Sequence, residues 1–237
     1  DTFNPIYSTS PTVISLMGFV FEPLFSVNED GTTTNVLADS YTVSPDGKSI
    51  VVKLKQNVKW HDGSTFICPD ILYTIDKIKN SNSRYKSLLK TTTDVMAIDY
   101  NTLKVTFDKP TPNPVALLSF PIIKGYSADS GDFKPIGTGP YVFNKDKLDA
   151  YDTYHNGLAK ISVVKINNVP DSEKYISLFN ASVFDVADSG IIDMKTYTPR
   201  SKANVMNYVS NKMIYVGCAR DCVRIKRPAF LAIEKLP

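Results

Sequence analysis

Of the three Asp-Gly pairs in the chain, those at residues 46–47 and 62–63 place two tight turns close together around one strand-like segment. Asp-Gly is a preferred pair in short hairpin turns, because glycine readily adopts the positive φ that such turns require. The residues between them, 49–55 (SIVVKLK), are rich in β-branched side chains and are typical of a strand. We therefore predict a hairpin at SPDGK (44–48) and a second turn in VKWHDGS (58–64).

An amphipathic helix is predicted directly after the second turn. Isoleucine recurs at helical spacing between residues 67 and 78. Pro69 suits a first helical turn, where its missing N–H has no partner to lose. Ser64 or Thr65 is the predicted N-terminal cap.

The rest of the chain alternates irregularly between strands and helices, which indicates a mixed α/β architecture. Residues 95–108 predict two strands around a Tyr-Asn turn, and the three prolines of 109–115 exclude regular structure there. The other expectations are a loop over 1–12, a short buried helix over 13–21, a buried run over 117–127, a loop over 131–140 that enters a strand at 141–146, a strand over 161–170, a helix over 171–180 and a short strand over 183–189.

Composition excludes several classes of protein. The chain has 27 basic and 24 acidic residues, mixed along its length, for a net charge of +3. This balance does not indicate a nucleic-acid or membrane-surface protein. The longest apolar stretch, 13–25, is too short to span a bilayer and contains Glu22. The odd number of cysteines, Cys68, Cys218 and Cys222, argues against a disulfide framework, and with only two histidines an ordinary zinc site would need Cys68 or carboxylates. A packing role is expected for them, and whether Cys218 and Cys222 pair stays open.

The VKWHDGS stretch contains the only tryptophan and one of the two histidines, so it is the first candidate for chemistry. His61 and Asp62 are adjacent, so in an extended chain their side chains point to opposite faces and do not converge on one metal or one proton. The chain has no G-x-S-x-G nucleophile elbow for a Ser-His-Asp site. We interpret the stretch as a hairpin whose tryptophan seals a small core. An enzyme that uses His61 or His155 with an aspartate remains an alternative.

Two other motifs are not interpreted as catalytic or ligand-binding sites. IGTGPY (136–141) lacks the residues of a phosphate-binding loop, and its small residues indicate a tight passage of backbone. Asp185, Asp188 and Asp193 lack the spacing of a calcium loop and are predicted to lie on a solvated surface.

Several segments occurring in one order are more specific than any single motif. They are FNP (3–5), FEPLF (21–25), residues 37–75 with VKWHDG, KPIGTGPYVF (134–143) and LFNASVFDVADS (178–189). Together they resemble the family 5 extracellular solute-binding proteins of ABC importers, which include oligopeptide-, dipeptide- and nickel-binding proteins. The tail 221–235 resembles a helix of that family, although Pro228 stands where a small helix former is usual.

This resemblance implies an α/β (mixed α+β) fold of the type II periplasmic-binding-protein kind, with a mixed β-sheet and a smaller α/β side subdomain. Residues 1–35 and 136–237 would form a discontinuous core subdomain, and residues 36–135 the side subdomain. Members of the family are longer than this chain. The chain is therefore expected to be the first lobe only, without the second lobe that grips the ligand.

The resemblance further implies a binding protein, not an enzyme, that takes up oligopeptides in a cleft and delivers them to an ABC permease. Expected ligand-binding residues are Thr9, Ser10, Pro11 and Thr12 after the N-P motif, Tyr85, and Phe120 and Ile122. No cofactor, metal or nucleic acid is expected, and the full-length protein is expected to be a monomer.

The expected location is the outer face of the cell membrane, through a lipid anchor, or the periplasm. A receptor for nickel chelates or another small solute is the alternative within the family. A truncated interaction module without transport is a further alternative.

Overall fold

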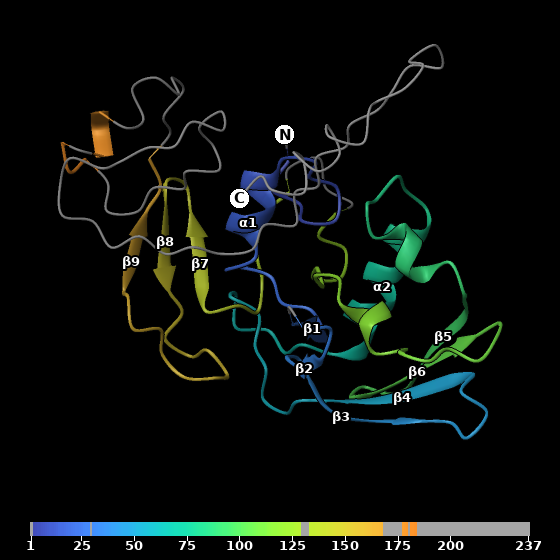
Figure 1. Cartoon of the computed structure of the whole chain (residues 1–237). Helices are drawn as coiled ribbons and strands as arrows, with labels where there is room; N and C mark the ends of the chain where they lie inside the picture. The colour runs from blue at the N-terminus through green and yellow to red at the C-terminus, as the bar shows by residue number, and fades with distance from the viewer. Residues whose placement is uncertain (1, 29, 129–132, 168–176, 180, 184–237) are drawn as a thin grey trace, which may run out of the picture. The chain divides into compact units, whose positions relative to one another are not determined.

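The computed structural model describes residues 2–28, 30–128, 133–167, 177–179 and 181–183 (Figure 1). The chain divides into two compact units, 1–168 and 169–237, and the first unit holds nearly all the described residues. Several predicted features lie outside the described residues: most of the helix over 171–180, the strand over 183–189 beyond its first residue, the three aspartates Asp185, Asp188 and Asp193, the two cysteines Cys218 and Cys222, and the tail 221–235.

The first helix begins earlier than predicted. Helix α1 spans Pro11–Met17, so the loop predicted over 1–12 ends at Ser10. Ser10 is the N-cap, and its hydroxyl accepts a hydrogen bond from the backbone N–H of Val13 at 3.4 Å. Proline at the first helical position needs no hydrogen bond for its nitrogen, which explains the early start. Strands β1 (Phe25–Val27) and β2 (Thr33–Asn35) then pair in an antiparallel ribbon.

A four-stranded sheet forms the middle of the first unit. Its strands are β3 (Ala38–Val43), β4 (Ser49–Leu54), β5 (Thr92–Asp99) and β6 (Thr102–Phe107), in the order β3-β4-β6-β5. All neighbouring pairs are antiparallel. The predicted hairpin at 44–48 is confirmed, and its Gly47 has a φ of +67°. The predicted strand pair around the Tyr-Asn turn is also confirmed.

Helix α2 (Cys68–Lys79) lies over one face of this sheet (Figure 1). The helix contacts β5, and its buried isoleucines belong to the same apolar cluster as the alternating buried positions of β4 and β6, which confirms the predicted amphipathic helix. The predicted cap was wrong: Ile67 is the N-cap, and Thr65 instead forms a bridge with Lys59. Ile67 has no polar side chain, so the helix start is stabilised from inside by the carboxylate of Asp70.

Two short 3₁₀ helices, η1 (Lys86–Leu89) and η2 (Ala116–Leu118), lie in the connections that follow. A three-stranded antiparallel sheet then joins β7 (Tyr141–Asn144), β8 (Lys147–Ala150) and β9 (Val163–Lys165). The strand at 141 is confirmed, whereas the strand predicted over 161–170 is formed in the described residues only at 163–165. The parallel pairing expected of a mixed sheet does not occur among the strands that the structure describes.

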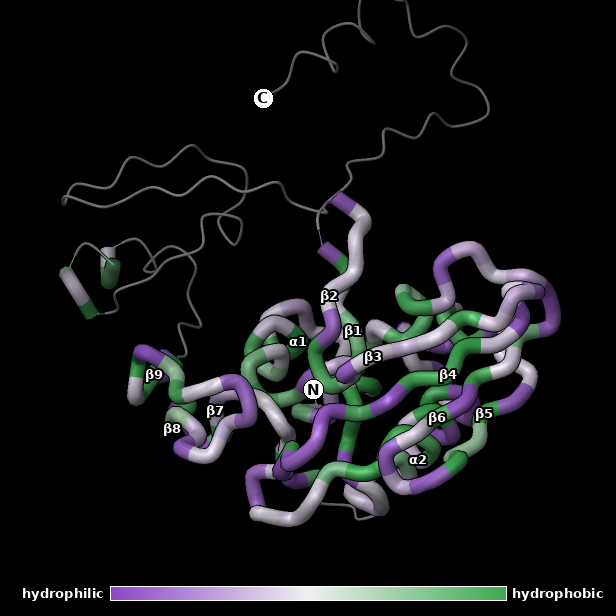
Figure 2. Tube along the Cα trace, turned by 90° about the horizontal axis from the view of Figure 1, so that it is seen from below, coloured by the Kyte–Doolittle hydropathy of each residue, from purple (hydrophilic) through white to green (hydrophobic). Residues whose placement is uncertain are grey.

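The buried apolar side chains of the first unit form one cluster. It joins residues of α1, β1, α2 and β8, and Figure 2 shows apolar segments running through α1, β1 and β4. Members of this cluster come from both sides of the predicted boundaries at 35/36 and 135/136. The division into two subdomains stays a prediction.

Candidate functional site

The VKWHDGS turn is built around its tryptophan. Trp60 is completely buried, and its ring lies 5.7 Å from that of Phe66, edge to face. Its indole N–H donates to Oδ2 of Asp70 at 3.1 Å. Gly63 has a φ of +83°, as a tight turn at this point requires. The interpretation of this stretch as a turn with a core-sealing tryptophan is therefore confirmed.

Asp70 holds three parts of the chain together. Besides the indole of Trp60, its carboxylate accepts the backbone N–H of Ile67 at 3.1 Å and that of Gly125 at 2.9 Å. Burial raises the pKa of Asp70, and these three hydrogen bonds oppose the rise because they favour the charged form. Asp70 thereby connects the turn, the start of α2 and the segment that leaves the core near residue 124.

His61 is held between two glycines rather than beside a carboxylate. Its Nε2 lies 2.9 Å from the carbonyl oxygen of Gly139, and its Nδ1 accepts the N–H of Gly137 at 3.2 Å. Since Nδ1 accepts a hydrogen bond, the imidazole is neutral and carries its proton on Nε2. Burial lowers the pKa of His61, although the Gly139 contact and the nearby negative charges act in the other direction. His61 is therefore a structural link to the IGTGPY loop.

Asp62 turns away from His61, as predicted. Its carboxylate forms an ion pair with Lys124 and accepts the hydroxyl and the N–H of Ser64 at 2.6 and 3.1 Å. Partial burial acts to raise the pKa of Asp62, but the Lys124 and Ser64 contacts outweigh it and lower the value to about 2. His61 and Asp62 thus have separate partners and do not converge on one metal or one proton.

We expect the burial of His61 to make the fold sensitive to acid. The pKa of His61 is below its ordinary value of 6.5 in the folded protein, so the unfolded chain binds a proton more readily. The contribution of neutral His61 to the free energy of unfolding is complete above about pH 6.5 and is lost as the pH falls through the folded pKa. For one proton, the free energy of unfolding falls by at most about 1.4 kcal/mol per pH unit. Urea unfolding between about pH 7.5 and pH 5 measures it. His61→Gln should flatten this dependence, and an unchanged slope in the variant would contradict the assignment.

The IGTGPY loop passes directly against residues 19–20. The N–H of Gly139 donates to the carbonyl of Val20 at 2.9 Å, and the N–H of Tyr141 donates to that of Phe19 at 3.2 Å. A Cβ atom on Gly137 would lie 1.8 Å from the carbonyl oxygen of Val20. The predicted tight backbone passage is confirmed, and lack of space for a side chain explains the glycine.

Glu22 is a buried carboxylate that collects donors from distant parts of the chain. It accepts the hydroxyl of Tyr154 at 2.6 Å and the hydroxyl of Thr138 at 3.0 Å, and Nε2 of His155 lies 3.0 Å from it. Burial, followed by the contact with Glu22, raises the pKa of the Tyr154 hydroxyl. The FEPLF segment, the IGTGPY loop and the turn at 154–155 are thus joined at one point.

The same arrangement bears on the alternative of an enzyme. His155 has a carboxylate partner, but both hydroxyls at this point, of Thr138 and Tyr154, donate to Glu22 and not to the imidazole. A histidine that activates a nucleophile must accept the hydrogen bond of that nucleophile. Neither histidine is placed in that way among the described residues.

An open cleft of about 520 Å³ lies beside the start of α2. The rings of Tyr73 and Tyr126 lie at its rim, tilted by 43° to each other with centroids 5.7 Å apart, and the charged residues of its lining are Lys124, Asp70 and Asp76. Tyr126 is 83% exposed. The lining also includes Trp60, Ser64, Thr65, Ile67, Pro69, Leu72 and Gly125. An apolar and aromatic lining with a few polar groups is typical of a small-molecule site.

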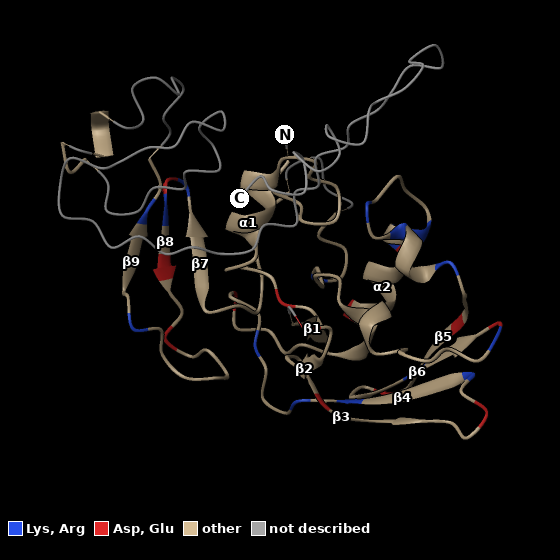
Figure 3. Cartoon of the chain, in the orientation of Figure 1, with Lys and Arg blue, Asp and Glu red and all other residues tan. Residues whose placement is uncertain are grey.

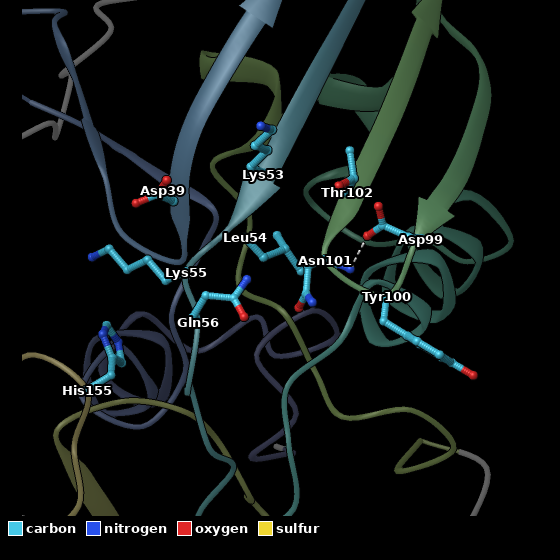
Figure 4. Close-up of a pocket in the computed structure, with 10 residues that line it drawn as sticks. All are labelled: Asp39, Lys53, Leu54, Lys55, Gln56, Asp99, Tyr100, Asn101, Thr102 and His155. Carbon is cyan, nitrogen blue, oxygen red and sulfur yellow. Dashed lines mark hydrogen bonds between the residues drawn. The ribbon is translucent and has the colours of Figure 1, made fainter.

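A second concavity, of about 740 Å³, lies at the ends of β4 and β6 (Figure 4). It has charges of both signs, from Lys53 at the end of β4 and Lys55 just after it, and from Asp39 on β3 and Asp99 on β5. Asp99 accepts the N–H of Asn101 at 2.7 Å, while the Tyr100 ring points away from the cavity (Figure 4). These opposed charges favour no particular ligand.

The predicted ligand residues after the N-P motif lie at the beginning of α1. Thr9, Pro11 and Thr12 are exposed, and Ser10 is the cap described above. A hydrogen bond stabilises the turn before them: the side-chain oxygen Oδ1 of buried Asn4 accepts the backbone N–H of Ile6 at 3.1 Å. The residues Thr9 to Thr12, predicted to bind ligand, therefore lie at an accessible part of the surface, and their ligand role stays a prediction.

The other predicted ligand residues are less accessible. Tyr85 is half-buried just before η1, under the guanidinium of Arg84 at 5.6 Å. Phe120 and Ile122 are 0% and 1% exposed and belong to the core. The chain emerges only after them, at Lys124 to Tyr126, beside the 520 Å³ cleft. A ligand role for these three residues stays a prediction.

Sequence reasoning missed the central positions of Glu22 and Asp70 and the rim residues Tyr73, Lys124 and Tyr126. The sequence contains one signal of this kind: Glu22 is a carboxylate inside the apolar run FEPLF, and a charge that is buried needs hydrogen-bond or ionic partners. The residues that the structure describes contain no group of three His, Cys, Asp or Glu side chains that could hold a metal ion. Cys68 is a buried free thiol whose pKa burial raises to about 12. No described helix is long and apolar enough to cross a membrane.

Comparison with known proteins now adds to this geometry. Residues 32–224 match the sequence model of the bacterial extracellular solute-binding proteins, family 5 (middle region). The chain is 36% identical over 195 residues to the glutathione-binding protein GsiB of Pectobacterium atrosepticum, which covers 75% of this chain and 37% of that protein. It thus spans little more than a third of the length of that relative.

Solved structures show the same fold. The oligopeptide-binding protein AppA of Bacillus subtilis, in complex with a nonapeptide, superposes with a TM-score of 0.67 at 22% identity, over 77% of this chain and 40% of that one. NikZ of Campylobacter jejuni, in complex with Ni(L-His), gives a TM-score of 0.66 at 24% identity over the same shares. The predicted fold class, a lobe of the type II periplasmic-binding-protein kind, is confirmed. The chain belongs to the family 5 bacterial extracellular solute-binding proteins.

Proposed function

We propose that this chain is the first lobe of a receptor that binds short peptides outside the cell and delivers them to an ABC permease. Support for the ligand class comes from the 36% identical relative, whose name gives glutathione, itself a tripeptide, as its ligand. The protein is a binding protein and not an enzyme in this proposal. It would work in the periplasm or, with a lipid anchor, at the outer face of the membrane, as a monomer.

The observation that carries the proposal is the 520 Å³ cleft beside α2. Its volume lies within the range of roughly 300–1,000 Å³ that is usual for small-molecule sites. The two tyrosines, tilted against each other, offer aromatic surface to a peptide, and Asp76 offers a negative charge to its amino terminus. Lys124 would meet the carboxyl terminus of the peptide by exchanging its present partner, Asp62. In this proposal the cleft is one wall of the binding site, and a second lobe would close over the ligand by a hinge motion.

The residues after the N-P motif are part of the same proposal. Thr9 to Thr12 would contribute backbone and hydroxyl groups to an extended peptide. Their exposure and the Asn4 turn that precedes them support this role, because a preformed loop loses little conformational entropy on binding. Tyr85 would lie beside the bound chain, with Phe120 and Ile122 behind it as supporting core.

Calorimetric titration of the natural protein that contains this chain tests the proposal. Glutathione and tri- to pentapeptides should give saturable heat at a stoichiometry of one. Binding of nickel-histidine alone would replace peptide by a metal chelate as the ligand. Absence of binding to all three, in a folded protein, would overturn the receptor proposal.

Substitution of two exposed tyrosines, Tyr126 at the cleft and Tyr100 away from it, tests where the peptide binds. Tyr126→Ala should weaken peptide binding about tenfold, as truncation of a contacting aromatic side chain commonly does. Tyr100→Ala is the matched control, because Tyr100 is also highly exposed (69%) but lies at the β5–β6 turn. Calorimetry on both variants decides. Equal affinities in the two would remove the cleft from the proposal without removing peptide binding.

A further inference from the structure

A local concentration of positive charge lies outside the proposed peptide site. Residues 77–93 contain five lysines and arginines and no aspartate or glutamate, although the whole chain has a net charge of only +3. These residues form the end of α2, η1 and the start of β5. Figure 3 shows the resulting basic groups at the end of α2 and in the connection after it.

Part of this segment folds around a cavity of about 480 Å³. We call it the lysine pocket. Its lining is Lys79, Lys86, Ser87, Leu89, Lys90 and Thr92, so no acidic side chain lines it. None of the ion pairs in the part of the chain that the structure describes includes any of the three lysines. Three lysines therefore line one concavity, and no ion pair among the described residues gives them a counter-charge.

The hydrogen bonds of the lysines leave donors available. Lys79 Nζ donates to the backbone oxygen of Thr92 at 3.0 Å, and Lys86 Nζ donates to that of Ser81 at 3.2 Å. An ammonium group has three N–H donors, and a neutral carbonyl does not cancel its charge. A basic residue in the last turn of a helix also interacts with the helix dipole; this applies to Lys79 at the end of α2, and much less to Lys86, because η1 has only four residues.

Thr92 supplies the second, independent observation. The residue is only 8% exposed, and its Oγ1 is buried without a hydrogen-bond partner. A buried hydroxyl that lacks a partner costs free energy, so such groups are rare unless something unseen satisfies them. Thr92 lines the pocket, and its backbone oxygen accepts a hydrogen bond from Lys79. The Thr92 hydroxyl has an O–H group that can donate to an oxygen of an anion.

We propose that the lysine pocket binds a tetrahedral oxyanion of the phosphate class. Lys79 and the Thr92 hydroxyl would hold it from the wall formed by α2 and β5, and Lys86 and Lys90 from the side of η1. Charge-assisted hydrogen bonds to phosphate oxygens are the strong contacts that such groups make. Two sources share this chemistry, free inorganic phosphate and the phosphoryl group of an anionic lipid headgroup.

Titration of the full chain with inorganic phosphate, at constant ionic strength set with chloride, tests the first source. Saturable binding by calorimetry is expected. Lys79→Gln and Lys90→Gln should each raise the dissociation constant about tenfold, and Thr92→Val about fivefold. Lys104→Gln on β6 and Thr42→Val on β3 are matched controls that should bind as the natural chain does, with thermal melting to verify that every variant is folded.

Co-sedimentation with vesicles of phosphatidylcholine, with and without phosphatidylglycerol, tests the second source. Vesicle binding that requires the anionic lipid and is lost in the pocket variants would assign the site to a headgroup. Phosphate binding with no vesicle binding would assign it to the free ion. Binding of either kind that the pocket variants leave unchanged would overturn the site, as would the absence of both.

Discussion

Gly137→Ala is expected to lower the free energy of unfolding by about 3 kcal/mol or more, because the new Cβ would lie 1.8 Å from the carbonyl oxygen of Val20. The obstacle is backbone and not a flexible side chain, so the loop itself must move. Such a movement would also disturb the Gly137 N–H bond to the His61 ring and the 2.9 Å bond from the His61 N–H to the Gly137 carbonyl. Urea unfolding of the variant measures the loss.

Two other glycines calibrate this result. At Gly139 the same substitution brings Cβ to 2.6 Å from the carbonyl oxygen of Phe19, so the cost should be large but smaller. At Gly18 the backbone is right-handed, with a φ of −62°, and the nearest atom is 3.2 Å away, so Gly18→Ala should change stability by less than about 1 kcal/mol. Equal losses of stability at the three positions would show that lack of space does not explain the glycines of the IGTGPY loop.

Asp70→Ala is the second substitution with a large expected effect. It would leave the indole N–H of Trp60 and the backbone N–H groups of Ile67 and Gly125 without their acceptor. A buried donor that loses its partner costs about 1–3 kcal/mol, so we expect a total loss of about 3 kcal/mol or more. Urea unfolding, followed through the fluorescence of the single tryptophan, measures it.

Asp70→Asn and Asp76→Ala are the controls for this prediction. The asparagine side chain would keep one carbonyl oxygen as an acceptor and lose the other, so about 1–2 kcal/mol should be lost. Asp76 lies on the same helix but is exposed, and its removal should cost less than about 0.5 kcal/mol. A loss at Asp70 no larger than at Asp76 would mean that the three hydrogen bonds add nothing to stability.

Local signals in the sequence predicted the local structure well. The Asp-Gly pair at 46–47 and the isoleucine spacing of 67–78 each act through neighbouring residues, and both elements were found. The cap of α2 was misjudged, because Ser64 and Thr65 are engaged in the preceding turn through Asp62 and Lys59. A polar residue before a helix does not cap it when a nearer partner is available.

Contacts over long distances in the sequence could not be foreseen. Glu22 meets His155, and Asp70 meets Gly125, only because the fold brings them together. The lysine pocket is similar: its charges are readable at 77–93, but the concavity depends on how η1 folds back toward Thr92. The rim of the proposed peptide cleft, with Tyr126 beside Tyr73, left no pattern in the sequence at all.

The bonds that join residues 19–22 to the IGTGPY loop also order events during synthesis. Thr138 is 116 positions after Glu22, and His155 is 133 positions after it. In a ribosome-bound chain that ends before residue 137, the carbonyl oxygens of Phe19 and Val20 and the carboxylate of Glu22 therefore lack these partners. Closing so long a loop costs entropy before any contact repays it. We expect the β3–β6 sheet, whose pairings are nearer in sequence, to form first, and the contacts of residues 19–22 with residues 138–155 to form after it.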